Sequence, residues 1–380
     1  RALGRRWGAR TAWYYWVNFP LWIASVACIF PSVLAGVWGV ALPLWARIGA
    51  ELVFVWGVTW AACSPVSDAD WILNGGAVIK VFITLVVGGV GVWFAAENGF
   101  ANPMGPETFL PDLANPDSLT YLSIILFNFM GFEVVATFAG SMDNPRRDIP
   151  VAIVVGGVTI AAVYILCGVG IGAAVPAEAL NLDSGIVDAV TAMVGGSSPL
   201  VWVVGAAFLV TLFANMVSWS FGINSVACRA AEDGNMPRPF ARRSAATSMP
   251  DGSALMTGVV ASLVLLLQVP LGEDSEVFWV FFSMNVVFLL LSYLPMFPAF
   301  ARLRRTDPTE RVFRAPFGGR ALAAVLAAPM VEIVLAVAAT VVPLGPGPDE
   351  AAKFPLLAGT VVLLAAGEAV RLACRRGGSR

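Results

Sequence analysis

Ten long apolar stretches constrain the fold of this chain more than any other feature of its sequence. A transmembrane α-helix needs about 20 consecutive, mostly apolar residues. The stretches that meet or nearly meet this length are residues 11–32, 41–63, 71–96, 118–139, 150–175, 199–226, 253–271, 276–301, 321–343 and 354–374. A soluble domain has about 25% charged residues, whereas this chain has 13% and is 58% hydrophobic. The sequence therefore predicts an all-α integral membrane protein with about ten transmembrane helices in a lipid bilayer.

Basic residues lie almost entirely in alternate loops between these stretches. Of the 23 Lys and Arg residues, 20 lie in residues 1–10, 140–149, 227–252, 302–320 and 371–380. Cytoplasmic loops are enriched in Lys and Arg. This distribution predicts a multi-pass protein of the cell membrane, with both termini of this chain in the cytoplasm and a bacterial inner membrane as its location.

The chain contains no histidine, which removes the nucleophile systems and metal sites that depend on an imidazole. Its five cysteines form no CxxC motif, so neither a disulfide framework nor a metal cluster is indicated. We predict no enzymatic activity, no metal, no cofactor and no nucleic-acid partner. An intramembrane enzyme would need paired acids or a nucleophile with its base, and the carboxylates in the spans are isolated.

The segment FNFMGFE, in the middle of the span 118–139, combines Gly131 with Glu133 and with the flanking Phe129 and Phe132. An ionisable group at membrane depth costs several kcal/mol and is a functional candidate by default, so Glu133 is predicted to take part in substrate binding and in ion or proton coupling. A glycine at this depth lets a helix open, so that backbone groups face a substrate cavity. The alternative is a close helix contact at Gly131, with Glu133 bonded to a neighbouring backbone.

Lys80 and Glu332 are the other two ionisable side chains that stand out inside the spans. Burial favours the neutral form of a lysine amine, so Lys80 is predicted to carry a proton or to replace a bound sodium ion. The alternative is a side chain that reaches lipid phosphates at the membrane surface. Glu332 lies near Pro329 and is the weaker candidate. Asn18 and Trp219 are interpreted from their types alone as helix-packing and interfacial residues.

The longest recognisable motif is GFEVVATFAGSMDNPRRDIPVAIVVGGVTIAAVYIL at residues 131–166. With RAAEDGNMPRPFAR at 229–242, and more weakly MFPAFARLRRTDP and FRAPFGG, it resembles the amino acid/polyamine/organocation (APC) superfamily of permeases. The resemblance implies a LeuT-like fold of twelve helices with a five-plus-five inverted repeat. Substrate in this family lies between unwound parts of the first and sixth helices.

The resemblance also implies a domain organisation. The chain is expected to begin just before the family's third helix, so that its ten spans are helices three to twelve of an N-terminally truncated permease. Residues 1–380 then form a single transmembrane domain. The remainder of the first repeat is 11–96, the second repeat is 118–301, and two additional C-terminal helices occupy 321–374.

Several site residues follow from the same resemblance. Gly131 and Glu133, with Phe129 and Phe132 beside them, match the break in the sixth helix, and Phe127 matches an aromatic residue that closes over substrate. Trp219 resembles an eighth-helix tryptophan that lines the pocket in arginine/agmatine-type antiporters. The substrate-facing side of the third helix is expected to carry Asn18, Phe19 and Ile23. Lys80 resembles a lysine that stands in for sodium in sodium-independent members.

The function predicted from these observations is secondary active transport of amino acids or related amines by alternating access, coupled to protons or to exchange. The partners are a small amino acid or polyamine-like substrate and the lipid bilayer, and the sequence does not indicate an oligomeric state. The alternative is a transport-inactive membrane sensor that retains the permease fold. A channel is disfavoured, because no repeated filter motif occurs.

Overall fold

The computed structural model describes residues 2–38, 42–105, 122–131, 142–176, 179, 185–196, 198–271, 276–307, 317–343, 348–351 and 353–377. All regular elements in these ranges are helices, so the predicted all-α fold class is confirmed. Phe132 and Glu133, which are predicted site residues, lie outside the described residues.

Eight helical segments of the described chain are long and apolar enough to cross a membrane. They belong to α1 (Arg5–Trp38), α2 (Leu44–Cys63), α3 (Val66–Asn98), α7 (Pro145–Ala174), α9 (Pro199–Glu232), α12 (Glu276–Tyr293) followed by α13 (Met296–Thr306), α14 (Gly319–Val341) and α16 (Lys353–Gly377). The shorter helices are α5 (Leu122–Asn128), α8 (Gly185–Val194), η4 (Arg238–Ala241), α10 (Asp251–Leu266), α11 (Gln268–Leu271) and α15 (Pro348–Ala351). The chain is therefore a multi-pass membrane protein.

The predicted spans differ from the helices in two places. Residues 253–271 form the 16-residue helix α10 and the short α11 instead of one long helix. Within 118–139, the described helix α5 covers only Leu122–Asn128. Between the predicted spans 150–175 and 199–226, residues Gly185–Val194 form the short helix α8. The apolar face of α8 is buried against α3 and α9, so this face contacts other helices of the protein.

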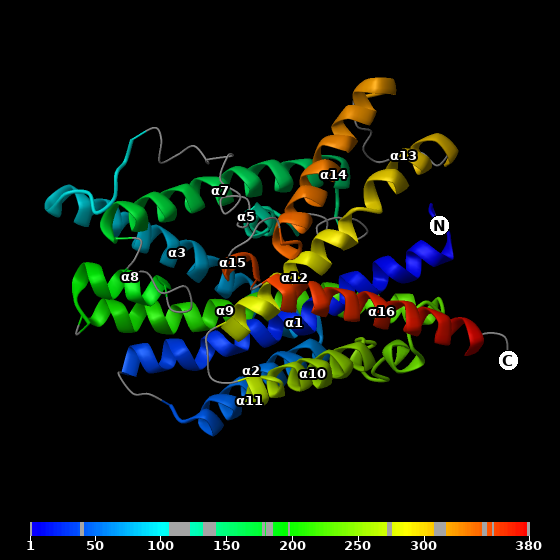
Figure 1. Cartoon of the computed structure of the whole chain (residues 1–380), viewed down its shortest axis with the longest axis horizontal. Helices are drawn as coiled ribbons and strands as arrows, with labels where there is room; N and C mark the ends of the chain where they lie inside the picture. The colour runs from blue at the N-terminus through cyan, green and yellow to red at the C-terminus, as the bar shows by residue number, and fades with distance from the viewer. Residues whose placement is uncertain are drawn as a thin grey trace.

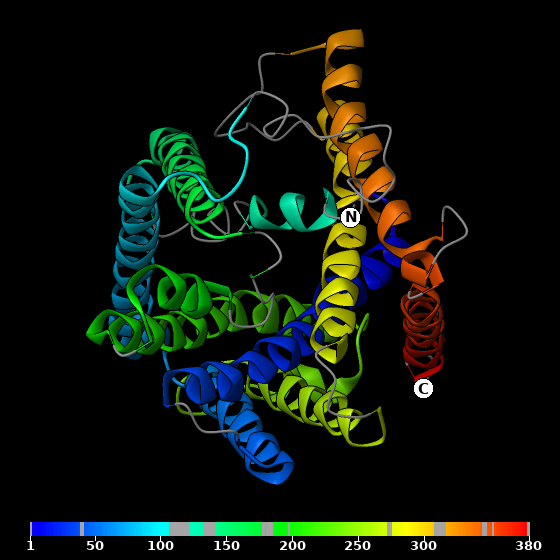
Figure 2. The same cartoon turned by 60° about the vertical axis from the view of Figure 1, so that its left-hand side comes forward.

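Helix α1 lies in the centre of the bundle and packs against α12, α9, α2 and α10. A second group consists of α3 and α7, which run side by side and meet the rest of the bundle through α9 (Figures 1 and 2). The start of α1 and the ends of α9, α13 and α16 lie on the same side of the molecule (Figure 1). The main apolar core contains Phe19, Ile23, Met216, Ile223 and Phe288.

A chain of polar side chains crosses this core and joins three helices. The Trp16 indole of α1 donates a hydrogen bond to Thr257 Oγ1 of α10 at 3.0 Å, and this hydroxyl donates to Asn224 Oδ1 of α9 at 3.0 Å. Trp16 also meets Phe240 of η4 edge to face, with ring centroids 4.7 Å apart. Because a lone polar group in an apolar interior is costly, this chain specifies how α1, α9 and α10 pack together.

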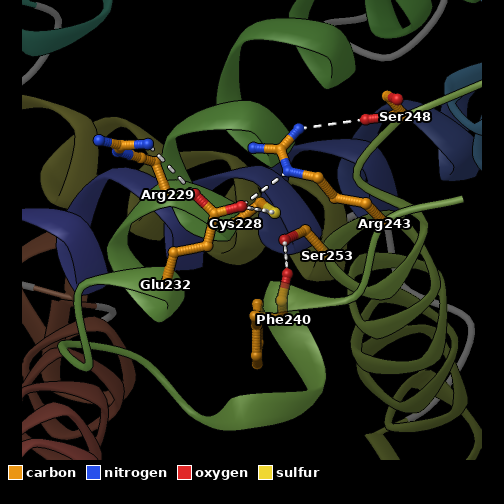
Figure 3. Close-up of polar contacts among 7 residues, drawn as sticks. All are labelled: Cys228, Arg229, Glu232, Phe240, Arg243, Ser248 and Ser253. Atoms are coloured by element: carbon orange, nitrogen blue, oxygen red, sulfur yellow. Dashed lines mark hydrogen bonds and ion pairs between the residues drawn. The ribbon is translucent and has the colours of Figure 1, made fainter.

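The loop between α9 and α10 is closed by a second polar network (Figure 3). Arg243 Nε donates to the Glu232 carboxylate at 2.7 Å, and its Nη1 donates to the carbonyl of Ser248 at 3.1 Å. The hydrogen bond to Glu232 raises the pKa of Arg243. Ser253 Oγ donates to the carbonyl of Phe240 at 2.9 Å. These contacts hold the loop against the end of α9.

Helices α3 and α7 approach so closely that only glycine fits at their crossing. A Cβ atom added to Gly170 of α7 would collide with the carbonyl oxygen of Gly88, and one added to Gly91 of α3 would collide with that of Gly170. Small residues at such crossings let helix backbones meet in a membrane, where association depends on close packing. The glycines at 88, 91 and 170 therefore set the distance between α3 and α7.

We expect Gly170→Ala to destabilise the protein by about 1–3 kcal/mol, because overpacking a close contact forces the backbones apart. Gly172→Ala is the matched control, since a Cβ atom at Gly172 meets nothing within 4 Å. Thermal unfolding of both variants in detergent, followed by tryptophan fluorescence, is the measurement. Equal melting temperatures for the two variants would contradict the packing assigned to Gly170.

Candidate functional site

The helix that carries the FNFMGFE segment stops within that segment. Helix α5 ends at Asn128, and two tight backbone hydrogen bonds follow, from Phe129 N to Leu126 O at 3.0 Å and from Met130 N to Phe127 O at 3.1 Å. Gly131 then has φ of +104°, a conformation that side chains other than glycine rarely adopt. The backbone is thus non-helical at the predicted break, whereas its role in binding stays a prediction.

The backbone at this break is held by side chains from two other helices. The amide N–H of Gly131 donates a hydrogen bond to the Tyr293 hydroxyl of α12, at 3.2 Å. A Cβ atom at Gly131 would lie 2.9 Å from Cζ2 of Trp219 on α9. Glycine is therefore needed at position 131 for two reasons, because its φ angle is positive and because the Trp219 indole ring leaves no space for a Cβ atom.

Trp22 of α1 brings two predicted site residues together. Its ring meets that of Phe127 on α5 and that of Trp219 on α9, each edge to face with centroids 5.1 Å apart. Phe127 also meets Phe282 of α12, at 5.5 Å. Edge-to-face aromatic pairs contribute about 0.5–1.5 kcal/mol each beyond their buried area. We call Trp22, Phe127, Trp219 and Phe282 the aromatic cluster.

Trp22 and Tyr293 were not predicted as site residues. The sequence does carry a signal for Trp22, because it follows Phe19 by three positions and Asn18 by four, and residues at these spacings share one helix face. Tyr293 has no comparable signal. Its relation to Gly131 depends on how α12 packs against α5, across more than 160 positions of the chain.

The three residues predicted on the substrate-facing side of α1 are all fully buried. Phe19 and Ile23 lie in the main apolar core, and Phe19 meets the Trp22 ring at 6.4 Å. Asn18 Nδ2 donates to the carbonyl of Tyr15, one turn earlier in the same helix, at 2.5 Å. Its Oδ1 is buried and has no hydrogen-bond partner among the described residues. Asn18, Phe19 and Ile23 therefore lie in the core of α1, the helix that also carries Trp22.

Lys80 is exposed and lines an open cavity of about 390 Å³ between α3, α7 and α9. Tyr164 of α7 and Asn215 of α9 also line this cavity. Phe129, which is 43% exposed, meets the ring of Tyr164 edge to face with centroids 6.0 Å apart. Tyr164 thus connects the break after α5 with the Lys80 cavity. Glu332 of α14 is exposed.

A buried acid in α2 is an additional feature. Glu51 lies in the predicted span 41–63, and its side chain is fully buried and accepts a hydrogen bond from Gln268 Nε2 of α11 at 2.5 Å. Its second oxygen has no hydrogen-bond partner among the described residues. The sequence alone does not indicate this pair, because its two residues are 217 positions apart.

Non-helical backbone at membrane depth, enclosed by aromatic side chains, is typical of secondary transporters with broken helices. The sequence profile of the amino acid permease family matches residues 1–366. The chain belongs to this family, and its substrate is a small molecule of the amino acid and amine class.

Curated relatives include transporters from two bacterial genera. A probable agmatine/putrescine antiporter, AguD, of Lactococcus lactis is 42% identical over 377 residues, which cover 97% of this chain and 80% of the relative. An uncharacterized transporter of Legionella pneumophila is 27% identical over 83% of this chain and 69% of the relative. A glutamate/gamma-aminobutyrate antiporter of Lactococcus lactis is 23% identical over 83% of this chain and 65% of the relative. These relatives support the prediction that the chain is a permease and not an enzyme.

We expect Gly131→Ala to reduce transport at least about tenfold, because strain of about 1–3 kcal/mol from its positive φ adds to the collision with Trp219. Gly99→Ala is the matched control: Gly99 has φ of +88°, yet a Cβ atom there meets nothing within 4 Å. Uptake of labelled amines and amino acids into proteoliposomes, normalised to folded protein, is the measurement. Equal uptake by the two variants would refute a special role for Gly131.

Proposed function

We propose that this protein exchanges small organic cations derived from amino acids, of the agmatine and putrescine class, across the membrane by alternating access. The observation that carries the proposal is the aromatic cluster beside the non-helical backbone at Gly131. The name of the relative that is 42% identical, a probable agmatine/putrescine antiporter, supports the choice of substrate.

The aromatic cluster suits a cationic substrate for a physical reason. The faces of tryptophan and phenylalanine rings attract ammonium and guanidinium groups, by about 2 kcal/mol or more where water is excluded. Trp22, Phe127 and Trp219 meet edge to face, so substrate entry requires these rings to part. We propose that they close over the bound cation and separate for release.

Charge at the site is proposed to come from two residues. Glu133 follows Gly131 by two positions and is proposed to pair with the substrate amine. Lys80, in its cavity between α3, α7 and α9, is proposed to provide the coupling charge, as a proton carrier or as a fixed cation. Tyr164 lines the Lys80 cavity and contacts Phe129. This contact supports a coupling between the charge at Lys80 and the backbone break near Gly131.

The topology and repeat organisation are part of this proposal. We propose that residues 11–96 and 118–301 belong to two inverted repeats and that 321–374 form two additional helices. Both termini of this chain are proposed to face the cytoplasm of a bacterium, because 20 of its 23 basic residues fall in the loops assigned to that side. The alternative of a transport-inactive sensor is not favoured, since named relatives are antiporters.

The test is an exchange assay with the whole gene product in proteoliposomes. We expect labelled agmatine to enter vesicles loaded with putrescine at least about tenfold faster than empty vesicles, because an exchanger returns to its starting conformation faster with substrate bound. Glutamate inside the vesicles is the control counter-substrate. Equal uptake into loaded and empty vesicles would exclude exchange, and failure of a broad panel of amines and amino acids would refute the proposal.

We expect Lys80→Met to change the pH dependence of exchange, because methionine keeps the length of the side chain and removes its titrating charge. Thr84→Val is the control, since Thr84 lines the same cavity and is uncharged. Initial exchange rates between pH 5 and pH 8 are the measurement. A Lys80→Met profile that overlies the unmodified profile would show that Lys80 does not take part in coupling.

A further inference from the structure

Arginines from both ends of the chain meet in a small pocket outside the proposed transport site. The pocket is lined by Arg5, Arg6, Ala9, Gly234, Asn235, Arg371 and Arg375, and its volume is about 30 Å³. It lies where the start of α1, the turn after α9 and the end of α16 come together (Figure 1). We call it the arginine pocket.

Arg5 is held in the wall of the arginine pocket by neutral acceptors. Its Nε donates to Asn235 Oδ1 at 3.3 Å, and its Nη2 donates to the carbonyl of Gly234 at 3.1 Å. These acceptors orient the guanidinium group and leave its charge uncompensated. Arginine keeps this charge at any physiological pH.

Arg371 is fixed on the opposite wall by one shared carboxylate. Its Nε and Nη2 each lie 2.8 Å from Glu368 Oε2, and the other oxygen of Glu368 accepts from Arg10 Nε at 2.5 Å. Arg371 Nη1 is buried and has no hydrogen-bond partner among the described residues. An unsatisfied buried donor on a charged group is costly, and this donor belongs to a residue that lines the pocket.

The charges around the arginine pocket do not balance. Four arginines (Arg5, Arg6, Arg371 and Arg375) and no carboxylate are among the described residues that line it. The Glu368 carboxylate beside the pocket is shared between Arg371 and Arg10. Arg6 and Arg375 are exposed and form no ion pair among the described residues. By contrast, the neighbouring Arg229 and Arg243 both pair with Glu232 (Figure 3). The arginines that line the pocket are therefore less compensated than those at the end of α9.

We propose that the arginine pocket binds one phosphate group, carried by the headgroup of an anionic phospholipid or by a free phosphate ion. The guanidinium group matches phosphate oxygens in geometry and charge. Basic pockets between the ends of transmembrane helices are a known type of site for lipid headgroups.

The position of the pocket favours a lipid as the source of this phosphate. It lies at the ends of two membrane-spanning helices, α1 and α16, where lipid headgroups are located. Trp7, which is 44% exposed, lies one turn from Arg10 and carries the Arg10 guanidinium over its ring at 5.2 Å. Exposed tryptophans are typical of the membrane interface. The bound phosphate then fastens α16 to α1 and to the turn after α9.

The test compares the two phosphate sources on the whole gene product purified in a neutral detergent. Thermal stability is titrated with phosphatidylglycerol in mixed micelles, with phosphatidylcholine as the zwitterionic lipid, and separately with inorganic phosphate. Native mass spectrometry counts the phosphatidylglycerol molecules that each variant retains. We expect saturable stabilisation by phosphatidylglycerol, and binding weakened at least about tenfold in Arg6→Gln/Arg375→Gln through loss of charge-assisted hydrogen bonds.

The matched control is Arg302→Gln/Arg305→Gln on α13, which removes two exposed arginines outside the pocket. This control variant should bind phosphatidylglycerol as the unmodified protein does. A saturable response to inorganic phosphate would also support the site and would identify the free ion as a ligand. The proposal is overturned if neither phosphate source binds the unmodified protein, or if both double variants lose binding equally. If Arg6→Gln/Arg375→Gln fails to fold, Arg6→Gln and Arg375→Gln are compared singly with Arg302→Gln on the same criterion.

Discussion

The structure around the proposed site depends on one constraint, which is that backbone polar groups at membrane depth need partners. A helix satisfies its own backbone, and a broken helix does not. At the end of α5, two tight turn bonds and the Tyr293 hydroxyl satisfy three consecutive amides, those of Phe129, Met130 and Gly131. The break is therefore stable because α12 supplies a hydroxyl group at the position of Gly131.

Trp22 links the side chains at the site, as the Tyr293 hydroxyl links α12 to the backbone. Its ring contacts one residue of α5 and one of α9, while its own helix is anchored in the core by the hydrogen bonds that run from Trp16 through Thr257 to Asn224. The aromatic cluster thus joins a short interrupted helix to a long, rigidly packed one. The proposed parting of these rings would therefore change the contact of α5 with both α1 and α9.

Charged side chains within the spans and at the helix ends have different surroundings in different parts of the molecule. Glu51 is buried with Gln268, and Lys80 lines a cavity with Tyr164 and Asn215. At the helix ends, Glu232 and Glu368 each pair with two arginines. The arginine pocket differs from these places, because four arginines and no carboxylate are among the described residues that line it.

Much of the fold and part of the candidate site were predictable from the sequence. A stretch of about 20 apolar residues matches the length of a helix that crosses a bilayer, and eight of the predicted spans are long helices in the structure. Gly131 stood out because glycine between aromatic residues is unusual at the centre of a span. Trp22 shares a helix face with Asn18 and Phe19 and was detectable by that spacing, whereas Tyr293 carries no signal until α12 is packed against α5.

The sequence by itself determined that this is a multi-pass helical membrane protein, because apolar length and local composition are properties of single segments. Its motifs at 131–166 and 229–242 carried the resemblance to permeases. Only the tertiary structure decided which side chains surround Gly131, that Glu51 is buried, and that arginines from the two ends of the chain share one pocket. The physical reason is that these contacts join residues from 88 positions apart, for Gly131 and Trp219, to 366 positions apart, for Arg5 and Arg371. Their geometry follows from how helices cross, which no local pattern records.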